Sequence, residues 1–182
     1  MGIFGGVEKT KRAGSDRLPD FREGDYRISI DVNKQFISKS PKIKGQGVFV
    51  MECTISEVLR EVPGVSNTAG SKVSWLQVLF RGPDGELTEG GERAMGRLKQ
   101  YAGALYADPE TGIEADDSVL TEDALDVITD ADKENNILAG EAFKGIELIL
   151  QVAPMVNGKT GERYTTKAGK QLCVEYFQGI PA

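Results

Sequence analysis

The clearest pattern in the chain lies between Gly145 and Phe177, in the sequence GIELILQVAPMVNGKTGERYTTKAGKQLCVEYF. Apolar residues occupy every second position at both of its ends, which is the period of a strand with one buried face. A turn signal, Asn157-Gly158, and a second break at Ala168-Gly169 lie between the two runs. The stretch therefore predicts two strands joined by a long loop. The alternating residues are Ile146, Leu148, Leu150 and Val152 in the first strand and Leu172, Val174 and Tyr176 in the second.

The loop predicted between these strands, Pro154–Lys170, is basic. Its only acid is Glu162, and it carries one aromatic residue, Tyr164. Cations beside an aromatic ring are typical of loops that contact the phosphates and bases of nucleic acid. The cations of this loop are Lys159, Arg163, Lys167 and Lys170.

A second basic segment follows the first predicted strand, Gly24–Val32, in which Tyr26, Ile28, Ile30 and Val32 alternate with polar residues. The segment Asn33–Gly47 contains Phe36 and four lysines but no acid. A loop with such uncompensated charge repels itself unless a polyanion is near. The alternative is an ordinary solvated loop. The lysines are Lys34, Lys39, Lys42 and Lys44.

Two further strands are predicted, at Val48–Val58 and Val73–Phe80. The alternation of the second one does not decide which of its faces is buried. Trp75 is therefore either a core residue or a platform on which a base stacks.

Two helices are predicted between the third strand and the closing pair. Glu92–Tyr106 has an apolar stripe at helical spacing, and Thr121–Ile128 begins with Thr121 as a natural N-cap. A helix between the third and fourth strands of a small barrel is the arrangement of the oligonucleotide-binding (OB) fold. We therefore expect a mainly β protein, a five-stranded OB-like barrel with a helical acidic insertion between strands 3 and 4.

Charge is distributed unevenly along the chain. The net charge is −6, but residues 1–44 carry +4, residues 86–141 carry −11 and residues 142–182 carry +2. The acidity thus belongs to the insert, 86–141, of a single OB-like domain, 23–182. Residues 1–22 are predicted to form a flexible basic arm, either a loosely ordered terminus or a segment that reaches phosphate or a neighbouring subunit.

Composition argues against an enzyme. The chain has no histidine, which removes the commonest general base and a common metal ligand. Nothing else marks a nucleophile, so we expect no catalytic activity and no cofactor. Cys53 and Cys173 are expected to be reduced thiols. No run approaches the ~20 apolar residues of a membrane span, so no membrane partner is expected.

One acidic segment has the residue spacing of a metal site. Residues 130–141 follow the ligand spacing of an EF-hand calcium loop. The sixth place holds Asn135 instead of glycine, the fifth holds Glu134, and the flanking helices are poor. A plain acidic turn is therefore the favoured interpretation, and a calcium site is the alternative. The candidate ligands are Asp130, Asp132, Glu134 and Glu141.

Several short motifs occur in an order that carries a family resemblance. They are FREGDYRISI at 21–30, VFVMECTI at 48–55, GSKVSW at 70–75, MGRLKQYAGALY at 95–106 and the stretch Gly145–Phe177. In this order they resemble the small phage-encoded single-stranded-DNA-binding proteins with an OB-type core. The resemblance covers roughly Phe21 to Phe177 and implies an OB-type fold that binds single-stranded DNA.

These observations predict a sequence-nonspecific single-stranded-DNA-binding protein that acts in phage DNA replication or recombination, in the cytoplasm of the infected host cell. The first alternative is a non-enzymatic phage structural or interaction protein that docks through the acidic insert, and the second is a DNA mimic. Expected partners are single-stranded DNA, a replication or recombination protein bound through the insert, or a second copy of the chain. The predicted nucleic-acid-binding residues are Lys34, Phe36, Lys39, Lys42, Lys44, Trp75, Lys159, Arg163, Tyr164, Lys167 and Lys170.

Overall fold

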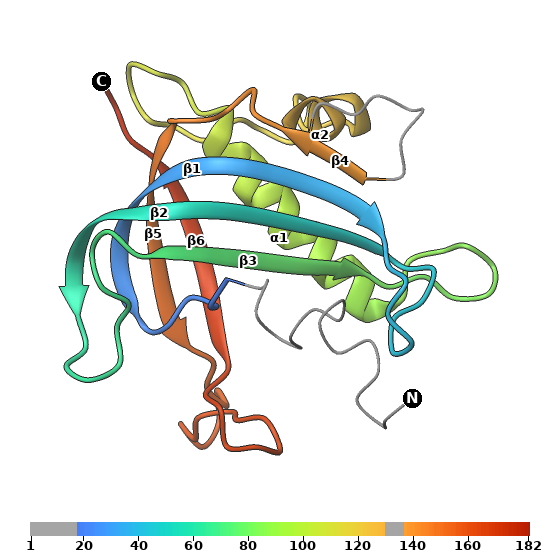
Figure 1. Ribbon diagram of the computed structural model, residues 1–182, viewed down its shortest axis with the longest axis horizontal. Coiled ribbons are helices and arrows are strands. Elements are labelled where there is room, and N and C mark those ends of the chain that lie inside the picture. Colours follow the sequence, from blue (N-terminus) through green and yellow to red (C-terminus); the bar gives the residue numbers. More distant parts are fainter. Residues whose placement is uncertain (1–17, 130–136) are drawn as a thin grey trace, which may run out of the picture.

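A computed structural model describes residues 18–129 and 137–182. In these residues the chain is mainly β, with one antiparallel sheet and two helices (Figure 1). Neither helix has the length and apolar run needed to cross a membrane. The elements are β1 (Gly24–Ile37), β2 (Gly47–Glu61), β3 (Lys72–Leu79), α1 (Glu89–Leu105), α2 (Glu122–Ile128), β4 (Ile137–Gly140), β5 (Glu147–Pro154) and β6 (Cys173–Gly179).

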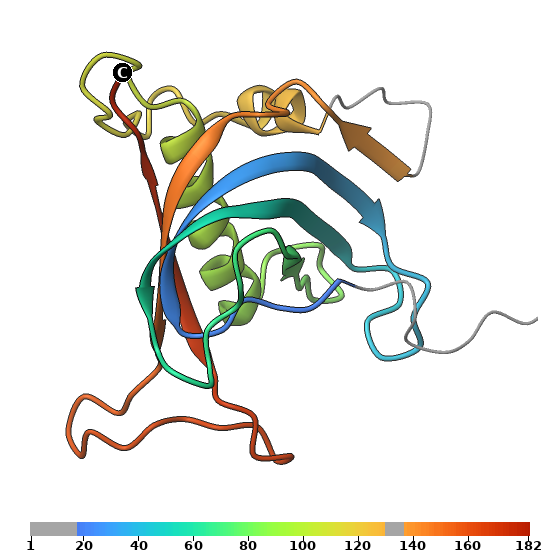
Figure 2. The ribbon, with the colours of Figure 1, turned by 60° about the vertical axis from the view of Figure 1, so that its left-hand side comes forward.

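The sheet has the strand order β3-β2-β1-β5-β6, and β4 pairs with the far end of β1, beyond β5. It curves strongly around α1, as Figures 1 and 2 show. Within the described residues β3 and β6 do not pair with each other, so the sheet is not closed into a barrel. The prediction of a mainly β chain with helices between the third strand and the closing pair is confirmed. The sheet has six strands where five were expected, because β4 also pairs with β1.

Helix α1 lies across the gap between β3 and β6 and contacts both strands. One of its side chains takes the hydrogen bonds that a neighbouring strand would otherwise make. Gln100 Nε2 donates to the carbonyl oxygen of Phe177 at 2.5 Å, and the Phe177 N–H donates to Gln100 Oε1 at 3.0 Å. An unpaired strand edge is a template for aggregation unless it is covered. The helix therefore protects β6 at the point where the barrel stays open.

The edge of β3 is covered by the residues just before β1. The Ser74 N–H donates to the Pro19 carbonyl oxygen at 3.0 Å, and Asp20 forms a parallel bridge with Ser74. Phe21 is buried in the core. Residues 18–22, which we assigned to the basic arm, thus dock on the sheet, and residues 1–17 lie outside the described residues.

Four aromatic side chains fill the space between the sheet and α1. Trp75 and Tyr101 each lie 4.9 Å from Phe177 between ring centroids, and 5.4 Å from each other. Phe49 completes the group. Trp75 is only 4% exposed, which favours the core alternative. A base cannot stack on Trp75 in this conformation, because protein rings already cover it.

The first strand contains an irregularity that alternation did not predict. Its register against β2 shifts between Ile30 and Val32, as a bulge with one extra residue produces. Val32, predicted to share the buried face of Ile30, is only half-buried, and Asn33 is buried instead. The Tyr101 hydroxyl donates to Asn33 Oδ1 at 2.7 Å, so the bulge points a polar group at the helix. Burial raises the pKa of Tyr101, which stays a neutral donor.

The face assigned to the last strand is wrong. Leu172, Val174 and Tyr176 are all exposed, and the fully buried residue of β6 is Phe177. Glu175, on the inward face, is half-buried. The apolar alternation in this strand therefore marks its outer surface, and one large aromatic residue carries its contribution to the core.

The second helix begins as predicted, because the Thr121 hydroxyl accepts a hydrogen bond from the Ala124 N–H. The first helix begins three residues before the predicted start, with Thr88 as its N-cap. Ile128 of α2 is 1% exposed and belongs to the main core. The acidic insert is thus an integral part of the core through α1 and the end of α2. Cys53 is buried, and Cys173 is half-buried and not bonded to it.

Two residues on opposite faces of β6 provide a test of this core. Phe177→Ala should lower the free energy of unfolding by about 3–5 kcal/mol, because it removes a ring that touches Trp75 and Tyr101. Val174→Ala, on the outer face, should cost less than about 1 kcal/mol. Urea unfolding of both variants measures the two costs. Equal costs would contradict the assignment of the two faces.

Candidate nucleic-acid interface

The first candidate element is the turn between β1 and β2, residues 38–46, here called the β1–β2 turn. Its ends are held by hydrogen bonds from the Ser38 N–H to Gln46 and from the Gly45 N–H to Ser38. Lys39, Lys42 and Lys44 are exposed on it. Within the described part of the chain, these three lysines make no ion pair. Their charges are therefore available to an anion from solution.

Two residues that we placed in this loop belong to a strand instead. Lys34 and Phe36 lie in β1, because that strand runs to Ile37. Lys34 Nζ lies 2.7 Å from Glu52 Oε1, so its charge is already compensated by β2. Phe36 pairs across the strands with Val48 and is half-buried. Lys34 therefore adds less free positive charge, and Phe36 less exposed aromatic surface, than the sequence indicated.

The second candidate element joins β5 to β6, residues 155–172, here called the β5–β6 loop. Bridges from Val156 to Arg163 and from Thr165 to Gln171 divide it into two small hairpins. The Asn157 side chain accepts from the Lys159 N–H at the first tip. The sequence thus forms an extended projection, visible at the bottom of Figures 1 and 2.

The cations of the β5–β6 loop fall into two groups. Arg163 lies 3.3 Å from Glu23, and Lys170 lies 2.6 Å from Asp20, so both tie the loop to the start of β1. Lys159 and Lys167 make no ion pair with any described residue. Tyr164 is 45% exposed. Lys159, Lys167 and Tyr164 are therefore the residues of this loop that a ligand can reach without breaking an ion pair.

The longest acidic stretch of the described residues lies on another side of the molecule. Residues 108–126, here called the acidic segment, hold eight acids and no lysine or arginine. This segment is at the top of Figures 1 and 2, and the β5–β6 loop is at the bottom of both. Repulsion between the acids and DNA bound at the β5–β6 loop is thus reduced, because salt screens charges beyond ~8–10 Å.

A small polar cavity lies at the open seam between β3 and β6, with a volume of about 240 Å³. Trp75, Glu175 and Arg97 line it together with Lys170. The indole N–H of Trp75 is buried and lies near the Glu175 carboxylate, and it makes no well-aligned hydrogen bond among the described residues. Burial raises the pKa of Glu175, and the nearby Arg97 opposes that rise. Sequence reasoning missed this group, because nothing local shows that Trp75 and Glu175 meet.

The described residues do not test the calcium hypothesis. Glu141 is described, whereas Asp130, Asp132 and Glu134 lie outside the described residues. No group of three or more Cys, Asp and Glu residues in the described ranges is arranged to hold a metal ion.

Comparison with known proteins adds no identification. No protein-family model matches the chain, and no curated protein sequence matches it. The resemblance to phage single-stranded-DNA-binding proteins therefore stays a prediction, and the function has to be argued from the surface of this chain.

The half-buried Glu175 predicts a pH dependence of stability. A carboxyl group whose pKa is raised in the folded state binds more protons in that state than in the unfolded chain. Its contribution to stability therefore falls as pH rises above the ordinary glutamate pKa of about 4.3. The Glu175→Gln variant lacks this loss, so its free energy of unfolding should rise relative to that of the native chain as pH increases from about 4 to 7. Urea unfolding across this range measures the difference, with Glu162→Gln in the exposed loop as the control. A difference that does not change with pH would contradict the burial of Glu175.

Proposed function

We propose that this chain binds single-stranded DNA with little sequence preference, through the β1–β2 turn and the β5–β6 loop. The observation that carries the proposal is a set of exposed lysines, each without a carboxylate partner among the described residues. Such charges attract a polyanion and release its counterions. The lysines are Lys39, Lys42, Lys44, Lys159 and Lys167.

Base contacts in this proposal come from Tyr164. It is the large aromatic residue that the β5–β6 loop exposes, and stacking of a base on such a ring contributes about 1–3 kcal/mol. Phe36 is half-buried, so it offers a base less ring surface than Tyr164 does. Trp75 belongs to the core and is not one of the proposed stacking residues.

The strand order supports an OB-like interpretation of the fold. An OB-fold is a partly open five-stranded Greek-key barrel that binds oligonucleotides near the loops that correspond to the β1–β2 turn and the β5–β6 loop. Here β1, β2, β3, β5 and β6 take the five places, and α1 lies between the third strand and the closing pair. On this interpretation the chain coats exposed strands during phage DNA replication or recombination and catalyses no reaction.

A charge reversal tests the proposal directly. The triple variant Lys39→Glu, Lys42→Glu and Lys44→Glu should weaken binding to fluorescent oligo-dT and flatten the dependence of affinity on salt, because fewer phosphates are neutralised. Fluorescence anisotropy at two salt concentrations measures both effects.

The control reverses three exposed cations outside both loops, Lys72, Arg93 and Lys144. It changes the net charge by the same amount, and the ion pairs that it breaks, Arg93 with Glu89 and Lys144 with Glu141, are exposed and contribute little. Equal loss of affinity in both variants would show that only overall charge matters. No binding by the native chain at low salt would remove the proposal in favour of a structural or interaction protein.

A further inference from the structure

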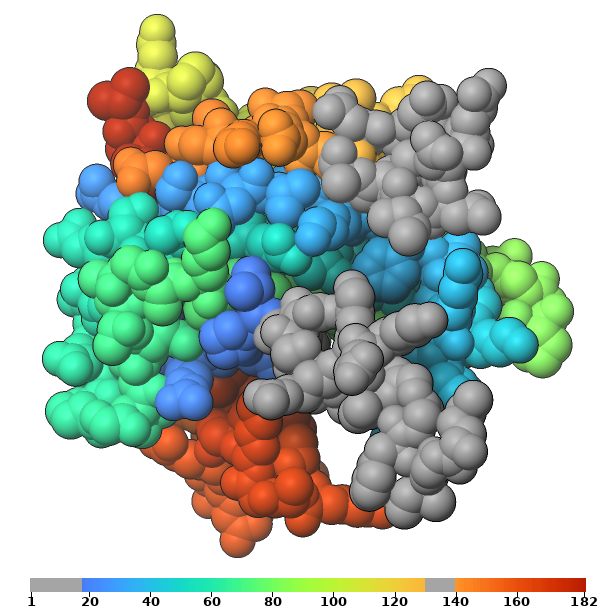
Figure 3. Space-filling model, viewed as in Figure 1, coloured from blue at the N-terminus to red at the C-terminus, as the bar shows by residue number. Residues whose placement is uncertain are grey.

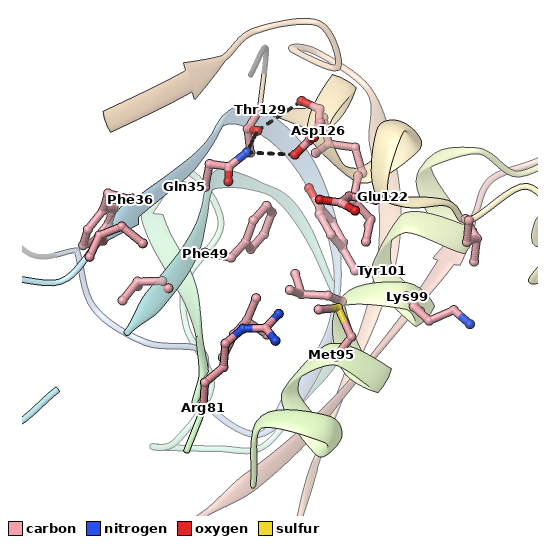
Figure 4. A pocket seen from close by; sticks show the side chains of 18 residues that line it. Gln35, Phe36, Phe49, Arg81, Met95, Lys99, Tyr101, Glu122, Asp126 and Thr129 are labelled. Atoms are coloured by element: carbon pink, nitrogen blue, oxygen red, sulfur yellow. Dashed lines mark hydrogen bonds between the residues drawn. The ribbon is translucent and has the colours of Figure 1, made fainter. Parts of the chain in front are cut away.

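A cleft opens at one end of the sheet, where β1, β2 and β3 face the two helices (Figure 4). Its volume is about 620 Å³, which is within the ~300–1,000 Å³ of sites that bind small ligands or anchoring side chains. Neither cationic loop contributes its lysines to this cleft. The lining of the cleft thus differs from the two cationic loops, and Ile37 and Gly47 at its edge flank the β1–β2 turn.

The floor of the cleft is apolar. Phe49 comes from β2, Leu79 from β3, Met95 and Leu98 from α1, and Leu125 from α2. Phe49 and Leu98 are buried, whereas Met95, Leu79 and Leu125 are half-buried and leave part of their surface towards the space. Apolar surface of this kind gains free energy when an apolar side chain displaces water from it.

The rim of the cleft has opposite charges on opposite sides. Glu122 and Asp126 of α2 lie on one side, and Arg81 reaches in from the other (Figure 4). Glu122 makes no ion pair among the described residues. Among the described residues, the Asp126 carboxylate accepts one hydrogen bond, a long one of 3.4 Å from Gln35 Nε2. Lys99, the other cation of the lining, lies 3.1 Å from Asp117 and is thereby compensated.

The acidity continues beyond the rim. Glu122 and Asp126 belong to the acidic segment, which contains no cation that could neutralise them. The cleft thus combines uncompensated carboxylates on its α2 side with the partly exposed apolar surface of Leu79, Met95 and Leu125. This combination is the complement of a segment that is both cationic and apolar.

We propose that this cleft binds a short segment of a partner protein that presents apolar side chains together with lysine or arginine. The apolar side chains enter the space between Phe49, Met95 and Leu98. A cation of the segment pairs with Glu122 and Asp126 in charge-assisted hydrogen bonds. Arg81 donates one bond to the Gly85 carbonyl oxygen, and its other N–H groups are donors for carbonyl oxygens of the bound segment.

A model peptide tests this proposal with the full chain. The probe is a fluorescein-labelled amphipathic peptide of leucine and lysine, about 14 residues long so that one apolar helical face can form. Its anisotropy is followed during titration with the protein. Two comparison peptides are a scrambled isomer without an apolar face and a version with glutamate in place of lysine. We expect the first peptide to bind and both comparison peptides to bind at least about tenfold more weakly.

Variants of the rim locate the binding. The double variant Glu122→Gln with Asp126→Asn should bind the leucine–lysine peptide at least about tenfold more weakly, because the lysine of the peptide loses both carboxylate partners. Glu110→Gln with Asp123→Asn removes the same charge from exposed positions outside the cleft lining and should change affinity less than about twofold. Met95→Lys, which puts a cation on the apolar floor, should also abolish binding, and circular dichroism checks that each variant is folded.

Several outcomes overturn the proposal. Equal binding of the scrambled peptide, or equal losses in the rim variant and its control, would mean that the acidic surface attracts cations without using the cleft. Absence of peptide binding by the folded native chain would remove the site. Sedimentation that shows self-association of the native chain, lost in Met95→Lys, would assign the cleft to a second copy instead of a partner segment.

Discussion

Helix α1 spans the gap between β3 and β6, and the rest of the structure depends on how it fills that gap. A curved sheet with two free edges needs either closure or cover. Gln100 provides the cover for β6 through two hydrogen bonds with the backbone of Phe177, and residues 18–20 provide it for β3. Behind these contacts the rings of Trp75, Tyr101 and Phe177 pack against one another. Side-chain packing thus replaces the ladder of hydrogen bonds that a closed barrel would have.

This arrangement also separates the charges of the protein. Since α1 enters the core, the residues that come after it emerge at one end of the sheet, where they form the acidic segment. The β1–β2 turn and the β5–β6 loop lie away from that end and carry the lysines that have no ion-pair partner among the described residues. A chain with a net charge of −6 can therefore present a cationic surface, because its two kinds of charge are attached to different elements. The space-filling view shows the β5–β6 loop at the bottom of the molecule, and the chain that follows α1 at the top (Figure 3).

Local pattern predicted most of the elements and little of what brings them together. Alternation identified five of the six strands, and Thr121 identified the start of α2, because both signals act within a few residues. The bulge after Ile30 and the outward face of Leu172 were missed, since packing against distant residues decides them. The same limit applies to the candidate interface. The sequence indicated the lysines but could not show that Glu52, Glu23 and Asp20 neutralise Lys34, Arg163 and Lys170.

We propose that single-stranded DNA contacts the β1–β2 turn and the β5–β6 loop and leaves the acidic segment free. Amide hydrogen exchange, followed by mass spectrometry with and without saturating oligo-dT, tests it most directly. We expect slower exchange in residues 38–46 and 155–172, with unchanged exchange in residues 108–126. Protection confined to residues 108–126, or no protection in either loop under conditions where oligo-dT is bound, would contradict it.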